Sequence, residues 1–283
     1  MFPIRDHNAS MRVPFVTWAL IAANVVIFLL YFPQLSARPA ALFEFYDTWA
    51  LRPMDVSNGE DLHTLVTSMF LHGGWLHLAG NMLFLWIFGD NIEDLLGHVG
   101  YLLFYLASGV AAAAGQWIAD PNSTIPVVGA SGAIAGVMGA YLLMFPRARV
   151  DILVFLLFFI RVFTIPAWVV LGLWFALQIV SAFATDPNMG GVAYWAHAIG
   201  FIAGFLLIIP LWLARGGPDW WASHGGHPPH GAVRYRSGVA GVPRVVRHGD
   251  AGRPARPLRD ITRVPRAGRR AGQRPGPWSG GRR

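Results

Sequence analysis

The sequence predicts an all-α, polytopic membrane protein in which six transmembrane helices form one bundle. Of the 283 residues, 54% are hydrophobic and 13% are charged, and the mean hydropathy is +0.45, whereas about a quarter of the residues in a soluble domain are charged. Apolar runs near the roughly 20 residues that cross a bilayer recur from residue 14 to residue 213. Arginines collect in alternate connecting segments, which is typical of membrane proteins with a fixed orientation.

The first expected span, Val13 to Phe32, is an almost unbroken apolar run. It is too long for the roughly 7–15-residue core of a signal peptide, so we interpret it as a transmembrane helix. Five further spans are expected at about residues 76–88, 99–118, 127–145, 166–183 and 192–213. Residues 152–160 are also apolar, but as a helix they would rise only about 14 Å, half of the hydrocarbon thickness. We expect an interfacial segment there.

The distribution of arginine predicts the orientation. With six spans, one side of the membrane carries the C-terminal tail together with Arg5, Arg12, Arg147 and Arg149. The loops on the other side are acidic or neutral, at residues 33–61, 119–126 and 184–191. Because basic loops stay in the cytoplasm, we expect both termini to be cytoplasmic, in the plasma membrane of a bacterium.

These features divide the chain into a cytoplasmic segment (1–13), a membrane domain (14–213) and a tail (214–283). The tail is rich in Arg, Gly and Pro and has a net charge of +12, which leaves −5 for residues 1–213. It holds too few apolar residues to offset chain entropy, so we expect it to be disordered. A solvated tail is the favoured interpretation, contact with anionic lipid headgroups is the alternative, and no nucleic-acid binding is expected.

Polar side chains are expected near the outer ends of three spans. His77 and Asn81 are four residues apart in the second span, so both project from one helix face. Ser131 is expected about one turn into the fourth span, and His197 about one turn into the sixth. Because polar groups are costly inside a bilayer, their similar depth indicates a single site toward the outer face.

The pairing of Ser131 with His197 would have the chemistry of a serine hydrolase. Glycines on the fourth and sixth spans permit close approach of the two helices, and they include Gly132, Gly200 and Gly204. A hydrogen bond of roughly 2.6–3.2 Å would let His197 act as general base for Ser131 as nucleophile. No Asp or Glu lies in either span, so we expect a dyad rather than a triad.

An oxyanion formed by such an attack needs hydrogen-bond donors, and His77, Asn81 and the backbone N–H of Ser131 are the candidates. Other interpretations stay open at this point. A lone intramembrane serine or histidine more often makes a structural hydrogen bond. A metal site built from His72, His77 and His197 is conceivable, but it lacks a carboxylate ligand and the chain has no cysteine. We expect neither a metal nor another cofactor.

Residues 14–213 resemble the rhomboid family of intramembrane serine proteases. The resemblance rests on three motifs that occur in the family's order, His72-x4-His77-x3-Asn81, Gly129-Ala130-Ser131-Gly132 and Ala196-His197-x2-Gly200-x3-Gly204, and Glu93-x3-Gly97 also fits. It implies a protease that cleaves single-span membrane proteins within or beside their transmembrane segment. It also implies Ser131 as nucleophile, His197 as base, and His77 and Asn81 in the oxyanion site.

The resemblance further implies a mobile fifth helix and a capping loop near residues 184–195. Two rivals remain: a catalytically silent relative that binds and escorts membrane proteins, and a small-solute transporter. Silent relatives typically lack the serine or the histidine, and no inverted repeat of a transporter is evident.

Four positions depart from the family pattern. His63 and Thr64 replace a frequent Trp-Arg pair, and Leu95 replaces a frequent Arg. Ala135 stands where some members have an aromatic ring against the catalytic histidine. We therefore expect another group, which the motifs do not identify, to hold His197.

Overall fold

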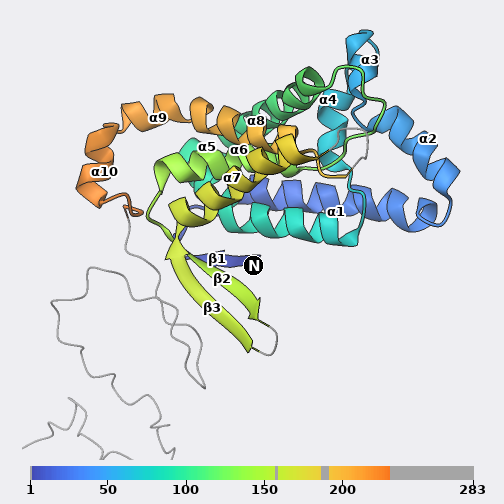
Figure 1. The fold of residues 1–283 in the computed structure, drawn as a ribbon. Coiled ribbons are helices and arrows are strands. Elements are labelled where there is room, and N and C mark those ends of the chain that lie inside the picture. The colour runs from blue at the N-terminus through green and yellow to red at the C-terminus, as the bar shows by residue number, and fades with distance from the viewer. Residues whose placement is uncertain (1, 157–158, 186–190, 230–283) are drawn as a thin grey trace, which may run out of the picture. The chain divides into compact units, whose positions relative to one another are not determined.

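The computed structural model describes residues 2–156, 159–185 and 191–229, most of which are helical (Figure 1). The helices are α1 (Phe15–Leu35), α2 (Pro39–Trp49), α3 (Pro53–Ser57), α4 (Thr64–Thr67), α5 (Trp75–Ala119), α6 (Ser131–Met144), α7 (Ala167–Ala184), α8 (Tyr194–Leu207), α9 (Ile209–Ala214) and α10 (Pro218–His224). A short 3-10 turn, η1 (Ser68–Phe70), precedes α5. The strands are β1 (Phe2–Asp6), β2 (Arg149–Leu156) and β3 (Phe159–Pro166).

Within the described residues, four helical stretches are long and apolar enough to cross a bilayer: α1, α5, α7 and the stretch Tyr194–Ala214 formed by α8 and α9. The apolar helix α6 is shorter, at 14 residues. Helix α5 has 45 residues, but Gly97 interrupts it with φ 71° and ψ 167°, a conformation that favours glycine. The stretches expected as the second and third spans lie on either side of this kink. The helices identify an integral membrane protein that crosses the bilayer several times.

Helix α6 forms the centre of the helical core. Figure 1 shows α6 among α5, α7 and α8, and 12 of its 14 residues are buried. A helix that is apolar on every side suits such a position. A methyl group on Gly204 of α8 would overlap the backbone of Gly136 on α6. Glycine at this position therefore lets the two helix backbones touch.

The expectation of an all-α fold is wrong for residues 149–156 and 159–166. They form an antiparallel hairpin of β2 and β3, and β1 pairs with the other edge of β2. The described residues of the interfacial segment expected at 152–160 therefore belong to a sheet. The segment is rich in β-branched residues, which favour extended structure. Hydropathy and helix length do not register that preference.

The carboxylate of Asp151 ties this sheet together. It is buried, and it accepts hydrogen bonds from Arg5 at 2.6 Å, His7 at 2.9 Å and Thr164 at 2.5 Å. Burial raises the pKa of Asp151, but the hydrogen bonds from Thr164, His7 and Arg5 outweigh it and hold the pKa below its ordinary value. The polar N-terminal segment is thus fixed to β2 by an ionised side chain.

A second buried carboxylate, Glu93, fixes the start of α1. It accepts the backbone N–H groups of Val16 and Thr17, each at 2.8 Å, and the Thr17 hydroxyl at 2.7 Å. The first N–H groups of a helix lack partners inside it, and a negative charge is favourable there. Glu93 therefore joins α1 to the part of α5 that precedes the Gly97 kink.

The tail expected to be disordered from residue 214 onward begins with ordered structure. Residues 218–224 form α10, which starts at Pro218, and Trp221 Nε1 donates a hydrogen bond of 2.9 Å to the Leu143 carbonyl. Trp221 also packs against Trp212, with ring centroids 5.0 Å apart. Trp221 belongs to the predicted tail and provides apolar surface that the average tail composition conceals. The rest of the predicted tail, residues 230–283, lies outside the described residues, as does its expected contact with lipid.

Candidate active site

Ser131 is the first residue of α6. The sequence predicts it about one turn into the fourth span, whereas in the structure it lies at the helix N-terminus. The preceding turn depends on Gly129, whose φ of 135° disfavours a side chain. A Cβ on Gly129 would also lie 2.9 Å from Nε2 of His77, closer than a real carbon allows. Glycine therefore lets the His77 ring reach the turn before Ser131.

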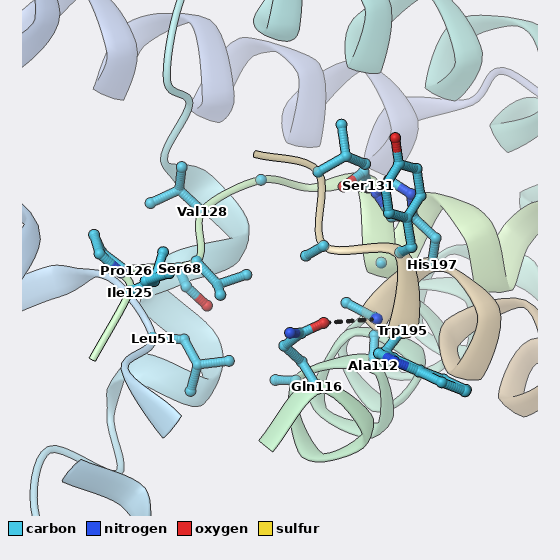
Figure 2. A pocket seen from close by; sticks show the side chains of 18 of the residues that line it. Leu51, Ser68, Ala112, Gln116, Ile125, Pro126, Val128, Ser131, Trp195 and His197 are labelled. Carbon is cyan, nitrogen blue, oxygen red and sulfur yellow. Dashed lines mark hydrogen bonds between the residues drawn. The ribbon is translucent and has the colours of Figure 1, made fainter. Parts of the chain in front are cut away.

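His197 lies in the first turn of α8, and its Nε2 atom is 2.7 Å from Ser131 Oγ. Figure 2 shows both side chains at one side of the pocket. Their helices are held together by glycine: a methyl group on Gly200 would overlap the carbonyl of Gly132. The glycines of the second and third motifs thus bring the serine helix and the histidine helix into backbone contact.

His77 and Asn81 lie on the first turns of α5 and line the same pocket as Ser131 and His197. Nδ1 of His77 accepts the backbone N–H of Gly73 at 3.3 Å. A neutral imidazole that accepts at Nδ1 carries its proton on Nε2, the atom nearest Gly129. Asn81 Nδ2 is buried and has no hydrogen-bond partner within the described residues. Among the described residues, Asn81 Nδ2 is therefore an available donor, and the tautomer of His77 places a second N–H near the turn before Ser131.

His72 is placed differently from the other residues of its motif. It is fully buried and does not line the pocket, and its ring packs edge-on against His77 with centroids 5.1 Å apart. Its backbone N–H donates to the Tyr31 hydroxyl at 2.7 Å, and that hydroxyl donates to the His72 carbonyl at 2.6 Å. Burial, followed by the effect of His77, lowers the pKa of His72 to about 3, so its ring is neutral near pH 7. His72 supports His77 rather than entering the site.

The pocket has a volume of about 490 Å³ and is bounded by α5, α6, α8 and the segment before α6. Its wall is mainly apolar. Leu51, Ile125 and Val128 lie on the side opposite Ser131 and His197 (Figure 2). Gln116 of α5 also lines it, and its Oε1 accepts the Ala196 backbone N–H at 3.2 Å. This bond, drawn dashed in Figure 2, ties the start of α8 to α5. Among the described residues, no group of three His, Cys, Asp or Glu could hold a metal ion.

Two residues of α7, absent from the predicted site, contact His197. Gln178 Oε1 lies 2.8 Å from His197 Nδ1, and the Trp174 ring lies 5.8 Å from the imidazole, at an interplanar angle of 34°. Ala135, at the position where some family members have an aromatic ring, is fully buried. The groups that hold His197 therefore come from α7 rather than from the serine helix. Gln178 is the one amide in the apolar run 166–183, and an intramembrane polar residue is a signal that could have found it.

The sequence is similar to a known domain family and to proteins of bacteria and yeast. The model of the Rhomboid domain family matches residues 59–214, more than half of the chain. The rhomboid protein YdcA of Bacillus subtilis is 35% identical over 144 residues, which are 50% of this chain and 69% of YdcA. Rhomboid protein 1, mitochondrial, of Saccharomyces cerevisiae is 30% identical over 197 residues, or 68% of this chain and 51% of that protein.

Rhomboid protease GluP of Bacillus subtilis is 42% identical over a shorter stretch of 78 residues, which is 28% of this chain and 15% of GluP. The chain thus spans about half of the yeast relative and a smaller part of GluP. The matched region contains His72, His77, Asn81, Ser131 and His197. The extent of the family match assigns this chain to the rhomboid family.

Proposed function

We propose that the chain is an intramembrane serine endopeptidase. Ser131 and His197 form a dyad that hydrolyses peptide bonds in or near the transmembrane segment of single-span membrane proteins. The observation that carries this proposal is the 2.7 Å contact between Ser131 Oγ and His197 Nε2. A relative that only binds membrane proteins has no need of this pair. Membership of the family and the protease name of GluP support the same class of reaction.

In the proposed reaction, His197 Nε2 removes the proton of Ser131 Oγ as that oxygen attacks the substrate carbonyl carbon. A C–O bond forms and the carbonyl oxygen becomes an oxyanion. The imidazolium then gives its proton to the leaving amine, the C–N bond breaks, and an acyl-enzyme remains. Water attacks the acyl carbon with His197 as base, which releases the carboxylate product and returns the proton to Ser131.

His77, Asn81 and the backbone N–H of Ser131 are the proposed oxyanion donors. Asn81 lines the pocket and its buried Nδ2 lacks a partner within the described residues, so this donor remains free for a ligand bound there. Ser131 begins α6, where the helix leaves its N–H groups unpaired. Donors held in place before the reaction stabilise the developing charge without reorganisation, which is often the largest contribution to acyl transfer.

We further propose that six helical segments cross the membrane: α1, the two parts of α5, α6, α7 and α8 with α9. Pairing of β1 with β2 supports this count. The strands must lie on the same side of the membrane, because an open sheet is not stable in hydrocarbon. The chain therefore crosses an even number of times between Asp6 and Arg149. Two passes in α5 give four crossings, whereas one continuous pass would give three.

Both termini then lie on one side, and the distribution of arginine makes that side cytoplasmic. The plasma membrane of a bacterium remains our proposal for its location, with the pocket toward the outer face. Single-span membrane proteins would enter this pocket from the bilayer. The capping loop expected at residues 184–195 falls partly on residues 186–190, which lie outside the described residues.

Cleavage of a single-span substrate by the purified full chain tests the proposal. The substrate would carry helix-breaking residues in its transmembrane segment and a fluorescent tag at each end, and both proteins would be reconstituted in liposomes. We expect two fragments with the wild type and none with Ser131→Ala or His197→Ala, while the Tm and circular dichroism of the variants stay unchanged. Cleavage that survives in Ser131→Ala, or a wild type that binds the substrate without cutting it, would overturn the proposal.

A further inference from the structure

Gln178 occupies the face of α7 that packs against the protein. The buried residues of α7 are Ala167, Leu171 and Gln178, which are spaced along one side of the helix. The residues around Gln178 point outward: Leu177 is 54% exposed and Val180 is 62% exposed. An amide on the packing face of an apolar helix must satisfy its donors and acceptor inside the protein. Its partners therefore indicate its role.

The orientation of the Gln178 amide follows from its two contacts. Its Nε2 donates to the Trp174 carbonyl at 3.4 Å, one turn earlier on α7. A carbonyl can only accept, so the atom that faces His197 Nδ1 at 2.8 Å is the acceptor Oε1. An acceptor at that position requires a proton on Nδ1 of the neutral imidazole. The lone pair then lies on Nε2, which is the atom in contact with Ser131 Oγ.

We propose that Gln178 is a positioning residue that fixes the tautomer and the ring orientation of His197. The inference rests on the proposed function, because the tautomer matters only if His197 acts as a base. In soluble serine proteases a carboxylate has this task. A neutral amide does the same without placing a charge at membrane depth, where a charge is costly. Gln178 would thus be a third, uncharged member beside the proposed dyad of Ser131 and His197.

The Trp174 ring adds a second restraint from the same helix. Its ring centroid lies 5.8 Å from that of His197 and 6.1 Å from that of Phe201. Both supports of the base therefore come from α7, whereas the nucleophile and the base come from α6 and α8. The position of α7 against α8 thereby determines whether His197 can accept the serine proton.

Four variants test this inference in the full-length protein. Gln178→Leu keeps the approximate volume and removes the acceptor, and Gln178→Glu keeps an acceptor. Leu177→Ala is the matched control on the outward face of α7, and Ser131→Ala reports the proposed function. Each protein is assayed for kcat, KM and the pH dependence of kcat with one transmembrane substrate, and its Tm is measured.

We expect Gln178→Leu to lower kcat roughly 10–100-fold with little change in KM, similar to the loss of the outer partner of a metal-bound histidine. Gln178→Glu should retain most of kcat and move the acid limb of the pH profile to higher pH, because a carboxylate stabilises the imidazolium. An amide that only packs would leave the kcat and the acid limb of a folded Gln178→Leu at wild-type values. His77, the titratable neighbour of His197, is the same in every variant and contributes equally to all profiles.

Wild-type kcat and an unshifted pH profile in Gln178→Leu would overturn the positioning role while leaving the proposed protease intact. If Gln178→Leu does not fold, Gln178→Glu decides alone, and an acid limb that coincides with the wild type overturns the inference. Failure of the proposed function gives a different result. In that case the wild type does not cleave, or Ser131→Ala cleaves as well as the wild type.

Discussion

Replacing Gly132 by alanine should disturb the proposed dyad through packing alone. A Cβ at this position would lie 2.6 Å from Cβ of Ala112 on α5, whereas ordinary contact begins at 3.4 Å. The shortfall is about 0.8 Å, and a close-packed interior transmits it to the neighbouring helices. Ser131 is the adjacent residue, so a shift of this size would stretch its 2.7 Å contact with His197 to about 3.5 Å, the limit of a hydrogen bond.

Misplacement of a reacting group by about 1 Å can cost roughly 10²-fold in rate, and overpacking costs about 1–3 kcal/mol of stability. We therefore expect Gly132→Ala to lower kcat roughly 100-fold, measured on the reconstituted protein with the tagged substrate. Gly172→Ala is the control, because its Cβ would meet no atom within 4 Å. Adding Ala112→Gly to Gly132→Ala removes the one tight contact and should restore most of kcat. Full activity in Gly132→Ala, or no recovery in the double variant, would refute this reasoning.

Three further predictions concern other parts of the molecule. Asn81→Ala should lower kcat by about 10²-fold with little effect on KM, since one oxyanion donor of several is lost; an unchanged kcat would remove Asn81 from that role. Because the pKa of Asp151 is held below its ordinary value, its stabilising effect is complete above about pH 4 and is lost as the pH falls through the folded-state pKa. Differential scanning should thus show the Tm of the wild type falling more between pH 6 and about pH 3 than that of Asp151→Asn, and equal slopes would contradict the assignment. Truncation after residue 229 should leave cleavage and Tm intact. Truncation after residue 214 should lower the Tm, because it removes α10 and the hydrogen bond of Trp221 to Leu143. Equal Tm values for the two truncated proteins would show that α10 adds no stability.

Much of the helical architecture could be predicted because the bilayer imposes length and polarity on each segment. The runs expected at 76–88 and 99–118 lie on either side of Gly97, and the glycines at 132, 200 and 204 lie at the contact of α6 and α8. The hairpin of β2 and β3 could not be predicted in the same way. Its residues are apolar, and hydropathy takes account neither of their β-branched side chains nor of the pairing of β2 with β1.

Some residues of the candidate site could be predicted from motif spacing, and others could not. Motif spacing is enough to indicate Ser131, His77 and Asn81, because each lies next to a glycine or one helical turn from its partner. The position of Gln178 depends on the rotation of α7 against α8, which motif spacing does not specify, and an amide takes the place that a carboxylate has in soluble serine proteases. His72 shows the converse, since it belongs to a motif but lies behind His77, where only tertiary packing reveals its place.

The central claim is that Ser131 is a nucleophile activated by His197. The most direct measurement is labelling of the full chain in liposomes by a fluorophosphonate probe, with the modified residue identified by peptide mass spectrometry. The account predicts a single adduct on Ser131, formed at a much lower rate in His197→Ala and absent in Ser131→Ala. An unlabelled wild type of native Tm, or an adduct that forms at the same rate without His197, would contradict it.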